Sequence, residues 1–566
     1  MPKSRWTYTD AQQMLQRTWG YPDFRPAQQE VIRAISQGSD VLAVLPTGGG
    51  KSLLYQVPGL LEPGLTLVIS PLIALMSDQV AGLQRRNIRA AYISSALGTR
   101  AVEQIFTNAA HGLYKFLYIA PERLQSELFL ARIGHISVSR LAIDEAHCIS
   151  EWGPNFRPAY RRILEAREVL RNVPVLAVTA TATPRVRQDM LDQLGMTAPK
   201  VFVQGFDRPN LIWSRFHTFD KRGKVREILE AVPGPAIIYA GSRKSVTQWA
   251  VDLRQDGITA EAYHAGLSTQ ERHDAQQRWM DDRCRVITAT NAFGMGIDKP
   301  DVRVVIHVAL PSTLESYYQE AGRGGRDGRT SHAVLLYQPG DEQLPTALIE
   351  RSHPSKADVQ TVYQATCSYL RVAYGDHPEE PLIIDLERLS ALTRMAVGSL
   401  ATGLEVLERL SFWEIVADPV RPERRFIRFL RAREQKPRID MHHVDHSRTT
   451  ALSRMDAMVA YAQTFQCRRY FLRTYYGESA PAQCGKCDVC LERHVPVHPT
   501  PKDEHIIKQL LMQIKQDGQP GTVPQTTAAR REGLLRWLYQ EGWIEQADPF
   551  RNEWHLSDKT RTTLKM

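Results

Sequence analysis

A glycine-rich loop that can cradle phosphates is the first chemically informative feature of the sequence. Residues 45–52 read Leu-Pro-Thr-Gly-Gly-Gly-Lys-Ser; they follow the apolar run 41–45 and precede a predicted helix that begins at Lys51. Backbone N–H groups of the glycines and of the helix start can surround a phosphate. Lys51 would reach the β- and γ-phosphates, and Ser52 would bind Mg²⁺. The predicted phosphate-binding residues are Thr47, Gly48, Gly49, Gly50, Lys51 and Ser52.

Two carboxylates and two arginines supply the groups that hydrolysis of a nucleoside triphosphate requires. Asp144 and Glu145 begin the sequence Asp-Glu-Ala-His after the apolar run 141–143. At the end of a strand, Asp144 would hold Mg²⁺, and Glu145 would orient and deprotonate the attacking water. Arg323 and Arg326 lie among glycines that allow close backbone approach, so they could stabilise the transferring phosphoryl group. Taken alone, this arginine segment could equally be an ordinary surface loop. The predicted catalytic residues are Lys51, Asp144, Glu145, Arg323 and Arg326.

Four of the seven cysteines are spaced as ligands of a structural metal. They are Cys467, Cys484, Cys487 and Cys490, in the pattern C-x16-C-x2-C-x2-C. Without a secretory signal, this spacing favours a tetrahedral zinc site over disulfides, with free thiols or an iron–sulfur cluster as alternatives. Closely spaced thiolates leave no open coordination position, so the zinc is expected to stabilise the fold. The remaining cysteines, Cys148, Cys284 and Cys367, are predicted core residues.

Short apolar runs that alternate with helical stretches predict two α/β lobes. The runs of the first lobe are 41–45, 66–70, 116–119, 141–143 and 175–178, and those of the second are 236–239, 260–263, 286–289, 304–308 and 333–337. A hinge is expected near Phe206–Arg215. ATP would bind at the carboxyl ends of the strands, and nucleotide could close the cleft between the lobes.

Residues 385–430 have the pattern of a winged helix, which is a DNA-binding arrangement of helices and a hairpin. A helix is predicted from Asp385, another over 397–410, and strands over 412–416 and 424–430. Residues 421–438 are strongly basic, and the outer face of that strand could meet phosphates. A winged fold that serves only as a spacer is the alternative. The histidine-rich segment Met441–His446 is predicted to be a solvated linker rather than a metal site.

The composition is that of a globular protein, with 43% hydrophobic and 23% charged residues. No apolar run reaches the length of a membrane span, and the first residues lack the pattern of a signal peptide, so a soluble cytoplasmic protein is expected. The net charge of +9 favours a polyanionic partner. Spread over 566 residues, that charge does not exclude a role in solubility alone.

The chain resembles the RecQ family of DNA helicases over most of residues 10–340. The segments that are similar to family motifs are Trp19–Gln29, Leu45–Ser52, Ser70–Gln79, Tyr118–Leu124, Thr179–Ala182, Phe206–Asn210, Tyr263–Gly266 and Thr290–Arg303. The strict phosphate-loop pattern has glycine in place of Leu45, but this family matches the loop as it stands here. By resemblance, Tyr21, Arg25 and Gln28 hold the adenine base, and Thr179–Ala182 links hydrolysis to movement along a strand.

An aromatic loop continues directly from the predicted ATP site. Residues 147–158 read His-Cys-Ile-Ser-Glu-Trp-Gly-Pro-Asn-Phe-Arg-Pro. Aromatic rings stack on bases and arginine pairs with phosphate, although a packed hydrophobic loop is the alternative. The resemblance implies that this loop couples DNA to turnover and separates the chain from RNA helicases with a similar carboxylate motif. The implied coupling residues are His147, Trp152, Phe156 and Arg157.

The chain departs from the family pattern after the second lobe. In the family the zinc module follows that lobe closely, whereas the winged-helix segment intervenes here, and Gly324 replaces the usual alanine. A second winged helix is predicted near the end, with a hairpin over 543–556. The predicted fold class is α/β, with two tandem RecA-like parallel-sheet lobes followed by winged-helix and helical zinc-binding modules. The predicted domains are residues 1–210, 211–350, 351–435, 436–495 and 496–566.

Together these features predict an ATP- and Mg²⁺-dependent, zinc-binding DNA helicase that walks on single strands and separates duplex. The resemblance implies 3′→5′ polarity, a role in DNA repair or recombination, and a location at the nucleoid. The expected partners are single-stranded and duplex DNA and a single-stranded-DNA-binding protein. The chain is expected to act as a monomer without membrane contact. The alternatives are an RNA-directed helicase and an ATP-gated DNA-binding scaffold that does not separate strands.

Overall fold

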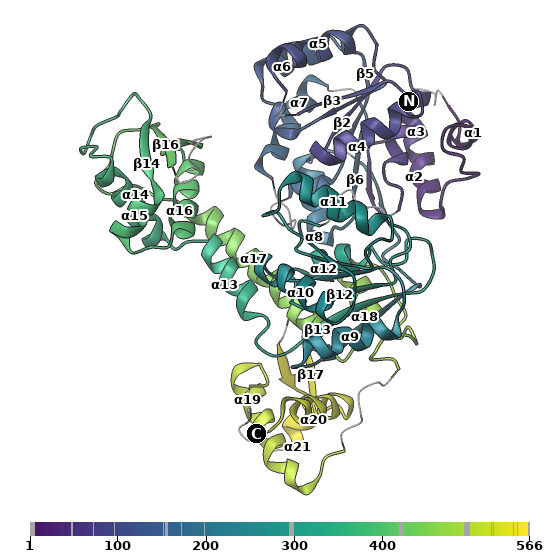
Figure 1. Cartoon of the computed structure of the whole chain (residues 1–566), viewed down its shortest axis with the longest axis vertical. Coiled ribbons are helices and arrows are strands. Elements are labelled where there is room, and N and C mark those ends of the chain that lie inside the picture. The colour runs from purple at the N-terminus through teal and green to yellow at the C-terminus, as the bar shows by residue number, and fades with distance from the viewer. Residues whose placement is uncertain are drawn as a thin grey trace. The chain divides into compact units, whose positions relative to one another are not determined.

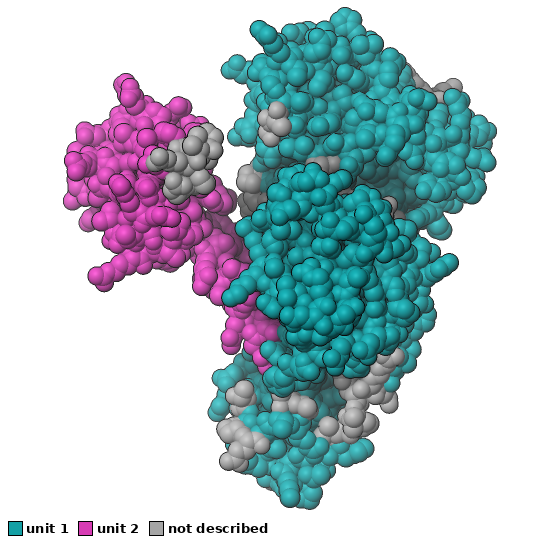
Figure 2. All heavy atoms as spheres, in the orientation of Figure 1, with its two compact units in different colours: residues 1–338, 458–566 teal, residues 339–457 magenta. Residues whose placement is uncertain are grey.

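The chain folds into two compact units, which Figure 2 distinguishes by colour. The first unit comprises residues 1–338 and 458–566, and the second comprises residues 339–457. The computed structural model describes residues 6–46, 49–71, 73–94, 97–150, 152, 157–170, 173–196, 198–293, 299–417, 424–491, 498–521, 523, 526–546, 548–551 and 553–563. Figure 1 labels many of the helices and strands of both units.

The first lobe contains a parallel sheet in the order β3-β4-β2-β5-β6-β1-β7. Its strands are β1 (Val41–Val44), β2 (Leu65–Ile69), β3 (Ala90–Ile93), β4 (Phe116–Ile119), β5 (Val138–Ile143), β6 (Val175–Thr179) and β7 (Lys200–Val203). On its two sides β1 pairs Val41 with Leu176 and with Lys200. Strands β1, β2, β4 and β6 are buried along their whole length, which explains their almost uninterrupted apolar sequences.

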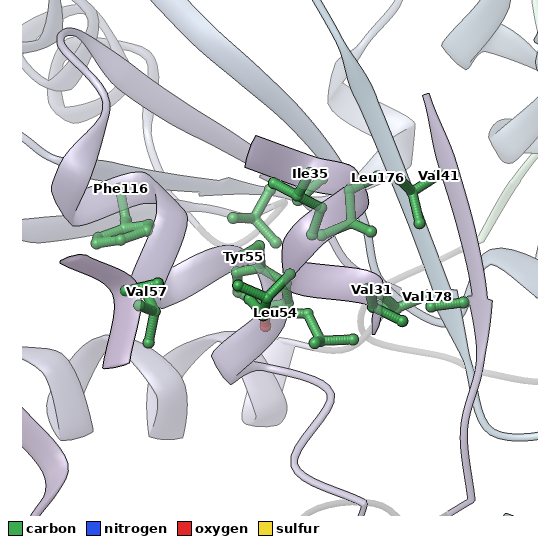
Figure 3. Packing of buried hydrophobic residues seen from close by; sticks show 14 of the residues in the cluster. Val31, Ile35, Val41, Leu54, Tyr55, Val57, Phe116, Leu176 and Val178 are labelled. Atoms are coloured by element: carbon green, nitrogen blue, oxygen red, sulfur yellow. The ribbon is translucent and has the colours of Figure 1, made fainter. Parts of the chain in front are cut away.

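Helices on this lobe pack apolar faces against the sheet. They are α1 (Tyr8–Trp19), α2 (Pro26–Ser36), α3 (Leu53–Leu61), α4 (Ile73–Gln84), α5 (Thr99–Ala110), α6 (Glu127–Ile133), α7 (Ile163–Val169) and α8 (Pro184–Gln193), with short 3-10 turns at Pro121–Arg123, Ala146–Ile149 and Pro158–Arg162. Figure 3 shows Val31 and Ile35 of α2 and Leu54, Tyr55 and Val57 of α3 in one buried cluster with side chains of the strands. This packing fixes the helix that follows the phosphate loop.

The second lobe contains a parallel sheet in the order β10-β11-β9-β12-β13-β8. Its strands are β8 (Leu211–His217), β9 (Ala236–Tyr239), β10 (Ala260–Tyr263), β11 (Val286–Ala289), β12 (Val304–His307) and β13 (Ser331–Tyr337), and its helices are α9 (Lys221–Ala231), α10 (Arg243–Gln255), α11 (Thr269–Met280) and α12 (Leu314–Ala321). The fold class predicted from the sequence is confirmed by these two lobes.

The predicted position of the hinge is partly wrong. Residues 211–215 belong to β8, which pairs with β13 from Leu211 opposite Ser331 to His217 opposite Tyr337. Only residues 204–210 connect the two sheets. Arg215 interrupts the apolar pattern of β8, yet its side chain is buried because it forms an ion pair with Glu532.

The second unit contains the predicted helices and hairpin strands of the inserted segment. Its elements are α13 (Gln343–Ser352), α14 (Lys356–Tyr369), β14 (Leu382–Asp385), α15 (Leu386–Thr393), α16 (Val397–Arg409), β15 (Trp413–Ala417), β16 (Arg424–Phe429) and the start of α17 (His442–Gln463). The strands form an antiparallel sheet in the order β14-β16-β15. Leu400, Leu404 and Leu407 of α16 are buried in its core, as their spacing predicts.

Two details of this region differ from expectation. His442–His446 begin α17, so the segment is helical and the prediction of a linker is wrong, whereas His442 and His443 are exposed to solvent as predicted; no helix breaker separates these residues from the buried part of the helix at Met455 and Met458. In the basic run, Arg431 donates to Leu410 O and lies over Phe412, so it packs on the module and not outward.

The end of the chain forms a small module. Helix α18 (Arg468–Tyr475) precedes this terminal module, whose own elements are a 3-10 turn at Pro501–Asp503, α19 (Glu504–Asp517), α20 (Ala528–Gln540), β17 (Ile544–Gln546), β18 (Trp554–Leu556) and α21 (Asp558–Thr563). The strands β17 and β18 form an antiparallel pair, and Leu534, Leu538 and Trp554 belong to one buried cluster. Among the described residues, no helix combines the length and the apolar character needed to cross a bilayer.

Candidate functional site

The phosphate loop lies between the end of β1 and the start of α3. Lys51 Nζ donates to Leu45 O at 3.3 Å and to Pro46 O at 3.4 Å, so the ammonium group lies against the carbonyls of its own loop. Gly50 has a φ of +69°, a conformation that costs glycine least. Thr47 and Gly48 fall outside the described residues. The described part therefore presents a fixed cation at the amino end of a helix, where a phosphate is favoured.

Gln28 ties the segment before α2 to this loop. Its Nε2 donates to Gly49 O at 2.9 Å and to Gly50 O at 3.1 Å, while its Oε1 accepts from Arg25 N at 2.9 Å. Gln28 is buried, whereas Tyr21 is 55% exposed. Gln28, one of the three residues implied to read adenine, thus uses its amide to join the phosphate loop to Arg25.

Asp144 continues from the end of β5 into the nucleotide site. Its backbone N–H donates to Ile69 O at 2.8 Å, and its carbonyl accepts from Tyr160 Oη at 3.0 Å. Burial raises the pKa of Asp144 to about 7, and the charge of Glu145 adds to this rise, whereas the charge of Lys51 opposes it. A divalent cation beside Asp144 would favour the ionised carboxylate.

Ser52 and Asp144 both act on the pKa of Tyr55. Burial raises the pKa of Tyr55 well above its ordinary value, and the charges of Tyr118 and Asp144 raise it further, whereas Ser52 lowers it. Tyr55 is thus near both Ser52 and Asp144, the two predicted protein ligands of Mg²⁺. A hydroxyl and a carboxylate are oxygen donors of the kind that Mg²⁺ prefers, so the donor set fits this ion.

Glu145 is held in a conformation that few non-glycine residues adopt. Its φ is +47° and its backbone N–H donates to Asp144 Oδ1 at 2.9 Å. Its carboxylate lies 3.3 Å from His147 Nδ1. Burial alone would raise the pKa of Glu145, but the hydrogen bond and charge of His147 and the charge of Lys51 lower it to about 2. Glu145 is therefore ionised at neutral pH and able to accept a proton.

Arg323 and Arg326 differ in their surroundings. Arg323 is 8% exposed and lies beside the buried Tyr239, whose pKa is raised by burial and lowered by the Arg323 charge. Arg326 is partly exposed. Burial lowers the pKa of Arg208, and the positive charges of Arg326 and Arg25 lower it further. The positive charges of Arg25, Arg208 and Arg326 therefore act on one another, and a polyanion would relieve this repulsion.

The carboxylate motif connects to the segment 179–182 and to the second lobe. His147 Nδ1 lies 2.7 Å from Thr179 Oγ1, and Gln319 Nε2 of α12 donates to Thr181 Oγ1 at 2.9 Å. These contacts form a continuous polar path from the predicted site of hydrolysis to the helix that precedes the two arginines.

The aromatic loop is fastened to the first lobe near both of its ends. Trp152 N donates to Ser150 Oγ at 3.2 Å, and the Arg185 guanidinium lies over the Trp152 ring. Arg157 N donates to Cys148 O, and Arg157 Nη1 donates to Pro71 O, both at 2.8 Å. Phe156 falls outside the described residues. A strand bound to this loop could therefore act on the carboxylate motif through a short stretch of backbone.

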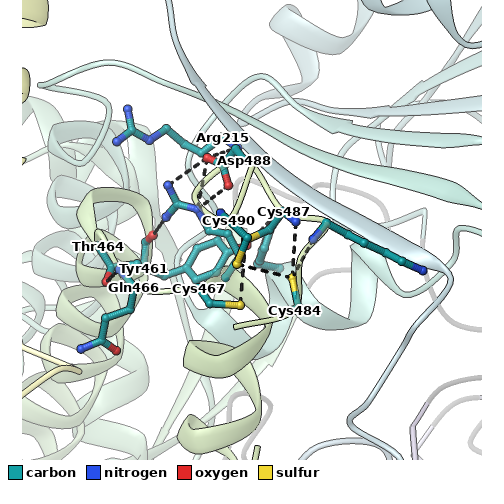
Figure 4. A network of polar contacts seen from close by, with 12 residues as sticks. Arg215, Tyr461, Thr464, Gln466, Cys467, Cys484, Cys487, Asp488 and Cys490 are labelled. Atoms are coloured by element: carbon teal, nitrogen blue, oxygen red, sulfur yellow. Dashed lines mark hydrogen bonds and ion pairs between the residues drawn. The ribbon is translucent and has the colours of Figure 1, made fainter. Parts of the chain in front are cut away.

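The four cysteines of the predicted zinc site converge (Figure 4). Their Sγ atoms all lie within 4.8 Å of one another, with 4.0 Å between Cys484 and Cys490 and 3.9 Å between Cys467 and Cys487. Tetrahedral zinc with Zn–S bonds of about 2.3 Å requires sulfur separations of about 3.8 Å. Backbone N–H groups of Cys487 and Cys490 donate to the sulfurs of Cys484 and Cys487. The geometry and donor set fit zinc.

Two residues of the site carry functions that sequence reasoning did not assign. Arg208 Nη1 donates to Gly322 O at 3.0 Å and Nη2 to Gly324 O at 2.8 Å, and Asn210 Nδ2 donates to Gly325 O at 2.7 Å. Both side chains hold the backbone that carries the two arginines. Their place in the motif Phe206–Asn210 was the available signal, but their acceptors are main-chain carbonyls, which leave no trace in the sequence.

Comparison with known proteins gives three family matches and a set of relatives. A model described as DEAD/DEAH box helicase matches residues 25–190, one described as helicase conserved C-terminal domain matches 220–328, and one described as RecQ zinc-binding matches 426–491. The probable ATP-dependent DNA helicase RecS of Bacillus subtilis (strain 168) is 40% identical over 358 residues, which cover 62% of this chain and 72% of RecS.

ATP-dependent DNA helicase RecQ of Pasteurella multocida (strain Pm70) is 41% identical over 381 residues, which cover 65% of this chain but only 60% of that protein. Among solved structures, helicase Lhr of Mycobacterium smegmatis bound to single-stranded DNA and AMP-PNP aligns with a TM-score of 0.46 and 19% identity, over 79% of this chain and 61% of Lhr.

Proposed function

The chain belongs to the RecQ family of ATP-dependent DNA helicases, and we propose that it hydrolyses ATP to move 3′→5′ along single-stranded DNA and to unwind duplex. The phosphate loop with Lys51 at the start of α3, together with the carboxylates Asp144 and Glu145 at the end of β5, carries this proposal. A cation at the amino end of a helix favours a bound phosphate, and the two carboxylates supply the metal ligand and the base that hydrolysis needs.

In hydrolysis, Lys51 would hold the β- and γ-phosphates, while Ser52 and Asp144 would hold Mg²⁺. Bound Mg²⁺ bridges phosphate oxygens and neutralises part of their charge. The ionised carboxylate of Glu145 would accept the proton of the attacking water. Arg326 would stabilise the charge that develops on the transferring group, because its side chain is partly exposed and can reach a ligand. Arg323, buried beside Tyr239, would instead keep the arginine segment in place.

Tyr21, Arg25 and Gln28 would select adenine, with the exposed Tyr21 ring free to stack on the base. Trp152, Phe156 and Arg157 would contact the tracking strand, and His147 would relay its presence to Glu145. The 3.3 Å approach of His147 to Glu145 supports this relay. We assign the activity to DNA repair or recombination on the family relationship, with a single-stranded-DNA-binding protein as a partner.

The second unit (residues 339–457), which we call the inserted module, is the proposed source of duplex contacts. In the terminal module, the arginines of α20 are engaged in contacts within the chain. Arg530 pairs with Asp503, Arg531 donates to Gly521 O at 2.7 Å, and Arg536 lies over Phe465. In the inserted module, by contrast, Val397 at the start of α16 is exposed and Gly398 has open space around it. An open second helix is the element that enters a groove in winged-helix proteins.

Strand displacement on two matched duplexes tests the proposal. One duplex carries a 3′ tail and the other a 5′ tail, with ATP and Mg²⁺ present and Glu145→Gln as the inactive control. We expect release from the 3′-tailed duplex alone, and none with the control. DNA-stimulated ATP hydrolysis without strand release from either duplex would contradict unwinding and favour a scaffold. A higher rate of ATP hydrolysis with RNA than with DNA would favour an RNA-directed helicase.

A further inference from the structure

The connection between the two sheets, residues 204–210, contacts both the arginine loop and the zinc module. We define the arginine loop as residues 322–330, between α12 and β13, and the zinc module as residues 458–491. Arg208 donates to the carbonyls of Gly322 and Gly324, and Asn210 Nδ2 donates to those of Gly325 and Arg329 at 2.7 and 3.0 Å. Two side chains of the connection thus hold the loop on both sides of Arg323 and Arg326.

The glycines of the arginine loop permit this close approach. A Cβ on Gly325 would lie 2.5 Å from Asn210 Nδ2, and Gly325 has a φ of +59°. A Cβ on Gly324 would lie 2.7 Å from Ser331 Oγ, which itself donates to Val302 O and Arg303 O at 2.8 Å. The loop backbone is therefore fitted to the connection, and its position depends on where Arg208 and Asn210 are held.

The other side of the connection is held by α18 of the zinc module. The Asp207 carboxylate accepts from Nε and Nη2 of Arg469, and Arg473 Nη1 lies 3.8 Å from it. The Phe206 ring stacks on Tyr476 with 4.1 Å between ring centres and 10° between planes. Helix α18 begins directly after Cys467, so the metal cluster fixes the start of the helix that carries Arg469.

The zinc module is itself anchored to the second lobe (Figure 4). Buried Arg468 and Asp488 form an ion pair at 3.1 Å, and Asp488 Oδ2 accepts from the backbone N–H of Arg215 in β8 at 3.1 Å. The zinc module therefore contacts both the connection and β8 of the second lobe, and the connection in turn holds the arginine loop. A bidentate arginine–carboxylate pair adds fixed geometry to this arrangement.

We infer that Asp207 and Arg469 are positioning residues for ATP hydrolysis, through which the zinc module sets the position of the arginine loop by way of Arg208. This inference rests on the proposed function, because it assigns the arginine loop a part in the hydrolysis of ATP. Zinc thereby contributes to the placement of Arg326 without contacting the nucleotide. The pair is partly exposed, so its effect is on geometry more than on stability.

The test compares Asp207→Asn, Arg469→Gln and the double variant in the full zinc-loaded chain. Each single variant should lower kcat for DNA-stimulated ATP hydrolysis by roughly three- to tenfold, the effect of losing a charge-assisted contact. KM for ATP and the zinc content should not change. The double variant should be no slower than the slower single one, since both remove the same contact. Amide hydrogen exchange over residues 322–330 should rise in all three.

Asp256→Asn is the matched control. Asp256 also forms a two-point pair, in which Arg222 of the second lobe donates from Nε at 3.1 Å and from Nη2 at 2.7 Å. This control should leave kcat and loop exchange unchanged. Wild-type kcat and wild-type loop exchange in Asp207→Asn would overturn the inference while leaving the proposed function intact. Absence of DNA-stimulated hydrolysis in the wild type would overturn the proposed function itself.

Discussion

At the scale of single residues, Gln28 joins two parts of the nucleotide site that the sequence separates. Its amide donates to the carbonyls of Gly49 and Gly50 and accepts from Arg25 N, so the phosphate loop and the start of α2 are held together. A Cβ on Gly50 would lie 2.5 Å from Gln28 Nε2, which shows how closely the loop follows this side chain. The residue implied to read the base therefore also shapes the phosphate site.

Replacing Gln28 with alanine should weaken binding of every nucleoside triphosphate. The two lost hydrogen bonds to the loop are worth about 1 kcal/mol each, so KM for ATP should rise by roughly thirtyfold. Because the loop contacts phosphate rather than base, KM for GTP should rise as well. Steady-state hydrolysis with both nucleotides measures this.

Gln29→Ala is the neighbouring control for Gln28. Its amide donates to Asp23 Oδ2 and Phe24 O rather than to the phosphate loop, so its removal should leave both KM values near those of the wild type. A rise confined to ATP in the Gln28 variant would mean that the side chain acts on adenine alone and that the loop contacts are dispensable.

At the scale of elements, α16 of the inserted module carries two glycines in different surroundings. A Cβ on Gly403 would lie 2.7 Å from Val362 Cγ2 of α14, whereas nothing lies within 4 Å of a Cβ on Gly398. Gly403 therefore allows the two helices to pack closely, and the β-branched Val362 has little freedom to move away. Gly398 has no such role in packing.

Gly403→Ala should consequently destabilise the second unit, by about 1–3 kcal/mol, the usual cost of overpacking a core. Gly398→Ala should be neutral or stabilise it by up to about 1 kcal/mol through helix propensity. Hydrogen exchange of peptides from α14 and α16 reports the local stability of this unit within the full chain. Equal exchange in the two variants would show that the helices tolerate a wider spacing at Gly403.

Elements that have a continuous apolar run or a periodic apolar pattern could be predicted from the sequence. The strands β1, β2, β4 and β9 lie in apolar runs, and α16 carries leucines at helical spacing, so their patterns indicated both type and position. The expected hinge included residues 211–215 of β8, in which Arg215 interrupts the apolar pattern. Its burial depends on Glu532 and Asp488, which lie far along the chain, and no local pattern can show such partners.

In the candidate site, too, the parts that lie within one short segment could be predicted, and the contacts between distant segments could not. The phosphate loop, the carboxylates and the zinc ligands each occupy a short segment with a chemical pattern, and the structure brings each group together. The approach of Arg208 to the loop that carries Arg323 and Arg326 arises only when the chain folds, through hydrogen bonds to Gly322 O and Gly324 O. It could not be read from spacing, because each arginine is an ordinary residue in its own segment.

At the scale of the whole molecule, the two winged-helix candidates offer DNA different surfaces. The second helix of the terminal module, α20, is occupied by contacts within its own unit, including the pair of Glu532 with Arg215. In the inserted module, Arg433 donates to Val372 O at 2.6 Å and is likewise occupied. Lys436 and Arg438, in the same basic segment, are exposed and available to phosphates.

Neutralising Lys436 and Arg438 together, as Lys436→Gln with Arg438→Gln, should therefore weaken duplex binding by a similar factor for every DNA sequence. Removing two phosphate contacts should reduce the slope of log affinity against log salt by about 2, since each contact contributes about 0.9. Lys508→Gln with Lys515→Gln removes the same charge from exposed positions of α19 in the terminal module and should leave the slope unchanged. Fluorescence anisotropy over a salt series measures both. If the slope fell only in the α19 variant, the terminal module would be the duplex-binding one and the assignment of roles to the two modules would be reversed.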